Sequence, residues 1–156
     1  MNRKNLTAAV LAGLAGVAGI VGTAQAVNIN PDGLGQVLIY PYYTTNGGNA
    51  TVLSVVNTTD HAKAVKVRFK EGANSREVLD FNLYMSAWDV WTAAIVDNAG
   101  TPSLIVNDNT CTVPYLYEND GGMQEFLVYG MNDTATADTY GDIARATEGY
   151  FEMIEM

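Results

Sequence analysis

The feature that most constrains this chain is a succession of short segments, rich in β-branched and aromatic residues, that are separated by clusters of turn-forming residues. Short strands at near-regular spacing are typical of antiparallel sandwiches and barrels. We therefore predict an all-β domain, an antiparallel β-sandwich of immunoglobulin-like or similar type. The predicted strands are residues 36–43, 50–57, 62–70, 76–85, 89–96, 103–108, 125–131 and 149–156, with a helical turn only in residues 141–149.

Apolar and charged residues alternate most regularly in residues 62–85, where a polar turn separates two such runs. Successive side chains of a strand point to opposite faces, so pairing the two apolar sets fixes the parity of the register. We expect a hairpin with Phe69 opposite Leu79 and Arg68 opposite Asp80. An exposed cross-strand charge pair contributes only about 0.2–1 kcal/mol, so the core residues hold this hairpin and its charged face needs no function to explain it.

Residues 1–26 have the three-part layout of a secretory signal peptide. Two basic residues in MNRKN precede a small-apolar run over residues 6–22, and small residues follow in TAQA at residues 23–26. We expect this segment to act as a signal peptide helix that is cleaved after Ala26, leaving one β-sandwich domain over residues 27–156. The alternative is a permanent membrane anchor, because an apolar run of about 18 residues can just span a bilayer.

The predicted signal peptide indicates where the protein is located, and its net charge indicates which partners it does not bind. A secreted protein would reach the periplasm, the outer surface of the cell or the extracellular space, and it would meet the membrane only through the signal peptide before cleavage. The net charge is −9, and acids dominate from residue 89 onward. An acidic surface repels nucleic acid and anionic lipid, so we expect no nucleic-acid partner.

The chain has one cysteine and one histidine, which limits the chemistry it can carry. Cys111 cannot close an internal disulfide, so it is either buried and inert or paired with a cysteine outside this chain. His61 lies beside Asp60 on a polar turn, where neither a nucleophile nor a zinc ligand set accompanies it. We therefore expect no enzymatic activity and no cofactor.

Calcium is the one metal for which the sequence offers candidate ligands. The acidic loop NDTATADTYGD brings Asp133, Asp138 and Asp142 close together, and extracellular loops of this kind sometimes bind calcium through oxygen ligands. The loop lacks a recognised calcium-binding pattern, so an ordinary acidic loop is the alternative reading.

Aromatic residues are the other candidates for a binding surface. The segments YPYY and WDVW contain Tyr42, Tyr43, Trp88 and Trp91. Tyr and Trp rings are frequent where proteins bind carbohydrate or protein, because a rigid ring supplies contact area at low entropy cost. Core packing is the competing explanation, and we expect one tryptophan to lie in the core while the other caps an edge of the sandwich.

Residues 33–96, together with NDNTCTVP (107–114) and EGYFEMIEM (148–156), resemble the N-terminal region of uncharacterised secreted or cell-surface proteins of Gram-negative bacteria. The resemblance implies an exported location and supplies no catalytic residues. Members of this group are usually longer, which implies that this chain is a fragment whose sandwich is incomplete at the C-terminus. The apolar final strand points the same way if it forms an open edge, and the alternative is a last strand inside the sheet.

The sequence thus predicts a secreted or cell-surface structural domain of the adhesion or assembly type, without catalytic activity. Its partner would be another surface protein or a glycan. The alternative is a secreted glycan- or calcium-binding module. For neither function does the sequence contain a motif that identifies a ligand.

Overall fold

The structure is a computed structural model, and it describes residues 29–116, 122–128 and 142–156. Residues 1–33 form a separate unit, of which residues 29–33 are described. These form a turn in which the Gly33 backbone N–H donates to the Asn30 carbonyl at 3.3 Å. The predicted signal peptide of residues 1–26 lies outside the described residues.

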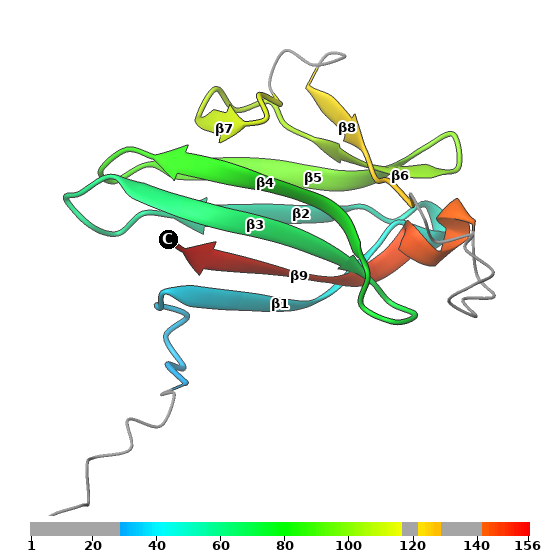
Figure 1. Cartoon of the computed structure of the whole chain (residues 1–156), viewed down its shortest axis with the longest axis horizontal. Helices are drawn as coiled ribbons and strands as arrows, with labels where there is room; N and C mark the ends of the chain where they lie inside the picture. The colour runs from blue at the N-terminus through cyan, green and yellow to red at the C-terminus, as the bar shows by residue number, and fades with distance from the viewer. Residues whose placement is uncertain (1–28, 117–121, 129–141) are drawn as a thin grey trace, which may run out of the picture. The chain divides into compact units, whose positions relative to one another are not determined.

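Residues 34–156 form the second unit, and its described residues build two antiparallel β-sheets (Figure 1). Sheet A has the order β1-β9-β3-β4-β7, and sheet B has the order β2-β5-β6-β8. The strands of sheet A are β1 (Val37–Thr44), β9 (Glu148–Glu155), β3 (Lys63–Glu71), β4 (Glu77–Met85) and β7 (Cys111–Val113). Those of sheet B are β2 (Thr51–Val56), β5 (Val90–Asn98), β6 (Thr101–Ile105) and β8 (Met123–Glu125). This all-β arrangement of two sheets is consistent with the predicted sandwich.

The hairpin of β3 and β4 has the predicted register. Phe69 pairs with Leu79, and Arg68 pairs with Asp80. The ion pairs between β3 and β4 are diagonal, however, whereas Arg68 and Glu152 of β9 lie directly opposite each other. Asp80 binds Lys66, whereas the guanidinium of Arg68 binds Glu77 at 2.6 Å and Glu152 of β9 at 3.1 Å. Long side chains reach diagonal neighbours as readily as direct ones, so the backbone register alone did not determine the charge partners.

An aromatic cluster fills the space between the sheets. Phe69 lies at its centre, with ring centroids 5.0 Å from Phe151, 5.4 Å from Phe126 and 6.2 Å from Tyr43. Trp91, which is fully buried, extends the cluster from sheet B. Burying one such side chain contributes roughly 1.5–3 kcal/mol, so this cluster supplies much of the driving force that holds the two layers together.

Two short strands differ from the prediction. β7 was not predicted, because the surrounding polar sequence NDNTCTVP shows no alternation, yet its three residues pair with β4. β8 spans Met123–Glu125, whereas the sequence predicted a strand over residues 125–131; residues 126–128 are not in a strand, and residues 129–131 lie outside the described residues. The apolar Phe126 that suggested this strand turns into the core instead. The predicted helical turn is present as a 3₁₀ helix, η4, at Ile143–Thr147.

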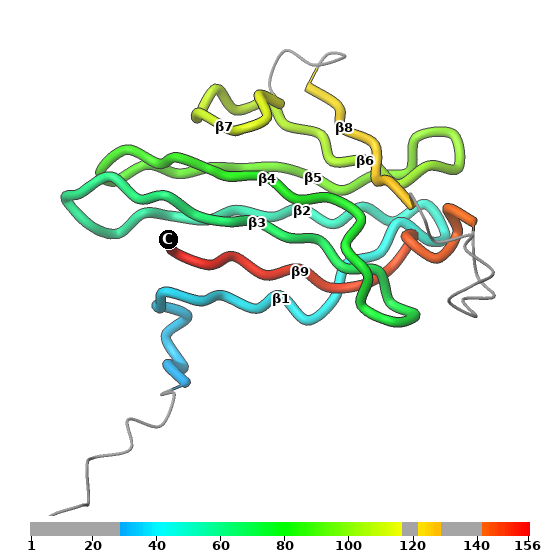
Figure 2. The backbone as a smooth tube through the Cα atoms, in the orientation of Figure 1, coloured from blue at the N-terminus to red at the C-terminus, as the bar shows by residue number. Residues whose placement is uncertain are grey.

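The last strand lies in the interior of sheet A, between β1 and β3, as the chain trace in Figure 2 shows. The expectation that residues 149–156 form an open apolar edge is therefore wrong. Gly149 permits this insertion, because a Cβ atom there would lie 2.0 Å from the Lys70 carbonyl oxygen. The first strand consequently occupies one edge of sheet A, and a 3₁₀ turn, η1 (Asn46–Gly48), connects it to β2 at the edge of sheet B.

Candidate functional site

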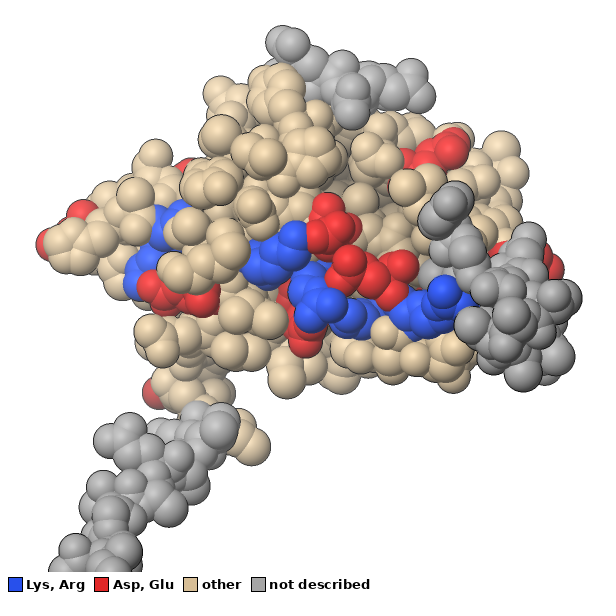
Figure 3. All heavy atoms as spheres, in the orientation of Figure 1, with Lys and Arg blue, Asp and Glu red and all other residues tan. Residues whose placement is uncertain are grey.

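The outer face of sheet A carries an ordered set of charges (Figure 3). Basic side chains from β3 alternate with acidic ones from β4 and β9, and they form ion pairs across the strands; these residues are Lys66, Arg68, Lys70, Glu77, Asp80 and Glu152. Their side chains are between 12% and 41% exposed. The charges therefore neutralise one another at the surface and do not present a single sign to a partner.

The outer face of sheet B is different, because its outward-facing side chains on β2 and β5 carry no charge. We call these residues the neutral face: Val52, Ser54, Val56, Val90, Thr92, Ala94 and Val96. Val52 is 79% exposed, Val56 is 51% exposed and Val90 is 47% exposed. Val56 and Val90 lie opposite each other in the ladder. Grouped exposed apolar residues of this kind mark interaction surfaces more often than scattered single ones do.

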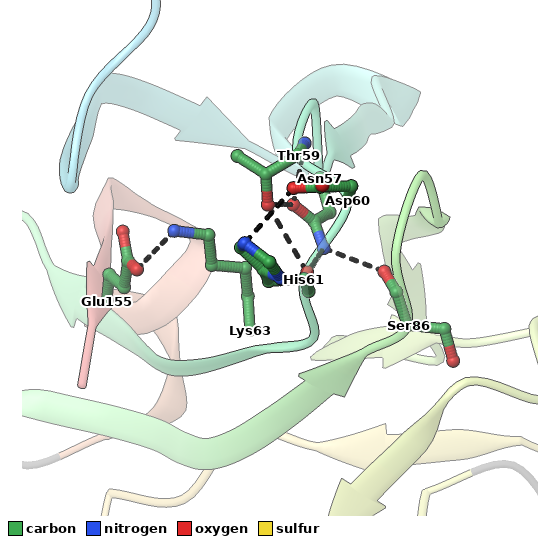
Figure 4. Close-up of polar contacts among 7 residues, drawn as sticks. All are labelled: Asn57, Thr59, Asp60, His61, Lys63, Ser86 and Glu155. Carbon is green, nitrogen blue, oxygen red and sulfur yellow. Dashed lines mark hydrogen bonds and ion pairs between the residues drawn. The ribbon is translucent and has the colours of Figure 1, made fainter.

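Asn57 fixes the loops at one end of the neutral face (Figure 4). Its side-chain amide, on a residue only 4% exposed, donates to the carbonyl oxygens of His61 and Ser86 at 2.6 and 2.7 Å. Its side-chain oxygen accepts from the Thr59 hydroxyl at 2.8 Å. Thr59 in turn accepts through its carbonyl oxygen from the backbone N–H of Trp88. One buried amide thus joins the turn after β2 to the turn before β5.

A cavity of about 260 Å³ opens beside these loops, between the ends of β1, β2, β3 and β9. Apolar side chains line its wall: Leu38, Val55, Val65, Met85 and Met153. The ion pair of Lys63 with Glu155, about a quarter exposed, lies on its rim (Figure 4). Binding sites for drug-sized ligands usually measure about 300–1,000 Å³, so this cavity suits a single apolar side chain better than a whole small molecule.

A buried ion pair holds the opposite end of sheet A. The Arg145 guanidinium of η4 lies 3.1 Å from the Glu71 carboxylate, and the two side chains are 2% and 0% exposed. Glu71 also accepts backbone N–H bonds from Ala73, Asn74 and Arg76 at 2.6–3.0 Å. Burial opposes ionisation of Glu71, but the bonds from Arg145 and the backbone outweigh it and hold the pKa of this carboxyl below its ordinary value. This cluster is built to fix the β3–β4 turn.

The aromatic candidates separate into two groups. Tyr43 and Trp91 are fully buried in the core, so neither can contact a ligand from solution. Burial raises the pKa of the Tyr43 phenol, and the negative charge of Glu71 raises it further. The Tyr43 hydroxyl donates to the Ala146 carbonyl at 3.2 Å. Tyr42 is 58% exposed and Trp88 is 66% exposed. The expectation of one core tryptophan and one peripheral tryptophan is therefore confirmed.

The remaining candidates do not converge on one site. Cys111 is exposed, so the alternative of a buried, inert thiol is wrong. Asp133 and Asp138 lie outside the described residues, whereas Asp142 caps η4 by accepting from the Ala144 N–H at 2.9 Å. The imidazole of His61 lies 3.2 Å from the Asp60 carboxylate on the surface, with side chains 83% and 72% exposed. Within residues 29–116, 122–128 and 142–156, no three His, Cys, Asp or Glu side chains lie close enough together to hold a metal ion.

The neutral face was missed at the sequence level, although its signal was present. In TVLSVV the outward positions of β2 are Val52, Ser54 and Val56, and the alternation predicts that they share a face. Nothing in the sequence said that this face would stay uncovered, since apolar residues on both faces of a strand are also typical of a strand buried in a sheet.

Comparison of the chain with protein-family models, curated proteins and solved structures finds no match. The resemblance to secreted or cell-surface proteins therefore stays a prediction. Helices long and apolar enough to cross a bilayer are not found in the part of the chain that the structure describes.

Proposed function

We propose that this protein is an exported structural domain of immunoglobulin-like type that makes contacts of the adhesion or assembly kind and catalyses no reaction. The observation that carries this proposal is the neutral face of sheet B. A chain with net charge −9 leaves three valines of that face between 47% and 79% exposed, while paired charges occupy the centre of the outer face of its other sheet, over β3, β4 and β9. Interfaces are depleted of charge at their centres, and the neutral face has that composition.

The location of the protein is part of the same proposal. The layout of residues 1–26 supports export and cleavage after Ala26. The intact mass of protein recovered from outside the cytoplasm should correspond to a chain that begins at Val27. A mature form that retains residues 1–26 would contradict the proposed signal peptide.

A binding experiment tests the role of the neutral face. The purified protein would be applied at low concentration to the cells that produce it, and the fraction retained would be compared with that of two variants. Thr92→Lys places a charge on the neutral face, and Asn82→Lys places the same charge on the outer face of sheet A. We expect Thr92→Lys to abolish retention and Asn82→Lys to preserve it. Equal retention of both variants would overturn the proposal.

A second candidate function follows from Trp88. Its ring is 66% exposed beside the neutral face, and exposed aromatic rings stack on sugars in many glycan-binding proteins. A glycan array probed with the wild-type protein and with Trp88→Ala separates the two functions. A sugar that binds the wild type and is lost in the variant would favour a glycan-binding module over a structural domain.

A further inference from the structure

The four edges of the two sheets differ in how they are protected against pairing with another strand. β7 and β8 are three residues long, and short edge strands offer little backbone to a partner. β1 is longer, but Pro41 lies within it and a β-bulge interrupts its register between Tyr40 and Tyr43. Both features are known protections of edge strands. β2 has six residues, TVLSVV, with no charge, no proline and no bulge in its pairing with β5.

The backbone of β2 identifies which groups face its free edge. The Ser54 carbonyl accepts a long bond, at 3.4 Å, from the Tyr40 hydroxyl across the edge, so it points away from β5. Val52 and Val56 each lie two residues from Ser54, so the alternation of the strand directs their backbone groups to the same side. Asn57, of the opposite parity, donates its N–H toward the Asp89 carbonyl beside β5, as this pattern requires. Three residues thus present their N–H and C=O groups at an edge that no described strand covers.

We propose that the free edge of β2 pairs with the same edge of a second copy of this chain, in antiparallel orientation. The proposal rests on the role proposed above for the neutral face and names its partner. In the two-fold register centred on Ser54, Ser54 lies opposite Ser54 of the second copy, and Val52 lies opposite Val56. The N–H and C=O groups of all three residues then face partners in the other copy, and the Ser54 carbonyl exchanges its long bond from the Tyr40 hydroxyl for a bond across the new ladder.

Charge favours this edge as the place where two copies of the chain can meet. The chain as a whole is strongly acidic, so most surfaces of two copies repel each other. The pairing of β2 with β2 places no like charges opposite one another, because all the residues of this strand are uncharged. It also makes the two neutral faces continuous across the two-fold axis, which doubles the uncharged surface that the assembly offers to other molecules.

Sedimentation velocity of the purified protein over a range of concentrations tests this pairing. We expect a reversible dimer in the wild type and a loss of at least about tenfold in dimer affinity, equivalent to about 1.4 kcal/mol, in Ser54→Lys, which would place two cations opposite each other. Ile39→Lys, on the protected edge of β1 at a site 67% exposed, is the matched control and should dimerise as the wild type does. Melting temperatures of both variants establish that they are folded.

Crosslinking tests the register. In a Cys111→Ser background, Ser54→Cys should form a disulfide-linked dimer on oxidation, because residues opposite each other in a hydrogen-bonded pair have Cα atoms about 5.5 Å apart. Val52→Cys in the same background should not, since the two copies of residue 52 lie four residues apart along the ladder.

Two results would overturn the pairing: a wild-type protein that stays monomeric at all concentrations, or a dimer that Ile39→Lys weakens as much as Ser54→Lys does. Crosslinking through Val52→Cys and not through Ser54→Cys would overturn the register. A monomer that is still retained on cells, with retention lost in Thr92→Lys, would refute the self-pairing and leave the proposed function standing. A dimer in solution, combined with unchanged retention of Thr92→Lys on cells, would refute the proposed function and leave the self-pairing standing.

Discussion

The outer faces of the two sheets follow the same alternating pattern, but they use their outward positions differently. On β3 and β4 several of these positions hold lysine, arginine and acidic residues that pair across the strands, whereas on β2 and β5 the neutral face has only valine, serine, threonine and alanine. Both sheets pack on the same apolar core, so burial of their inner faces does not explain the difference. This contrast is the basis for the proposal that sheet B, and not sheet A, makes a contact with another molecule.

The comparison also shows that charges on sheet A act in two ways. Pairs on the outer face are partly exposed and screened by water, whereas Glu71 and Arg145 are almost fully enclosed. Enclosed charges depend on each other far more than exposed ones do. The following predictions separate these contributions, beginning with the largest expected effect.

Arg145→Met should cost about 3–5 kcal/mol of the free energy of unfolding, because it leaves the Glu71 carboxylate buried without its cationic partner. Arg68→Met is the matched control on the outer face, at a side chain 36% exposed, and should cost about 1 kcal/mol or less. Urea unfolding followed by tryptophan fluorescence measures both. Similar losses in the two variants would remove the distinction between enclosed and surface charges.

Asn57→Ala should cause the next largest loss in the free energy of unfolding, about 1–3 kcal/mol, because it leaves buried polar partners of the amide without a hydrogen bond. The same change at Asn82, on the outer face of sheet A, should stay within about 0.5 kcal/mol. Thermal melting of the two variants tests this pair. We also expect Asn57→Ala to shift the fluorescence of Trp88, whose loop it releases, and an unshifted spectrum with full stability would contradict the role given to Asn57.

The pH dependence of stability should be smaller and should come in part from Glu71. Its pKa in the folded protein lies below the ordinary value of 4.5, so its contribution is fully present above that value and is lost as the pH falls through the folded pKa. Glu71→Gln removes this titration. Urea midpoints measured between neutral pH and pH 3 should therefore fall less steeply in the variant than in the wild type, and parallel curves would contradict the assignment.

The smallest effect is expected for the ion pair between Lys66 and Asp80. Asp80→Asn should cost about 0.2–1 kcal/mol at low salt, since its side chain is 41% exposed. The difference should shrink in 1 M salt, where the screening length is about 3 Å. Denaturant unfolding at the two salt concentrations measures it. A loss that is large and insensitive to salt would mean that this face is held by its charges after all.

The part of the fold that the sequence predicts correctly consists of long alternating strands. The register of β3 and β4 follows from apolar parity, because a slip of one residue would bury Lys66 and Arg68. The short strands β7 and β8 were not predicted correctly, since three residues carry too little alternation and their pairing depends on strands far away in the sequence. The insertion of β9 beside β1 is likewise invisible in either segment alone.

The candidate site was predicted less well than the fold. The burial of Trp91 follows from its position in β5, whereas Trp88 is exposed because it lies in the turn before that strand, with φ of 60°. Tyr43, a binding candidate in the sequence, lies in the core because the bulge in β1 changes which side of the strand it faces. The neutral face depends on which strand ends up at an edge and which face stays uncovered. Both are properties of the assembled sheets, so local patterning could not supply them.

The position of β9 between β1 and β3 has a consequence for the order in which we expect the chain to fold. β1 has no strand partner other than β9 among the described residues, and the contact of Tyr42 with Glu148 joins positions 106 residues apart. Contacts between residues so distant in sequence form slowly, because a long loop must close before they provide any stabilisation. The hairpins β3–β4 and β5–β6 can form from neighbouring segments. We therefore expect the first strand of the described chain to be among the last to be incorporated, with its apolar side chains left without their partner strand until residues 148–155 are in place.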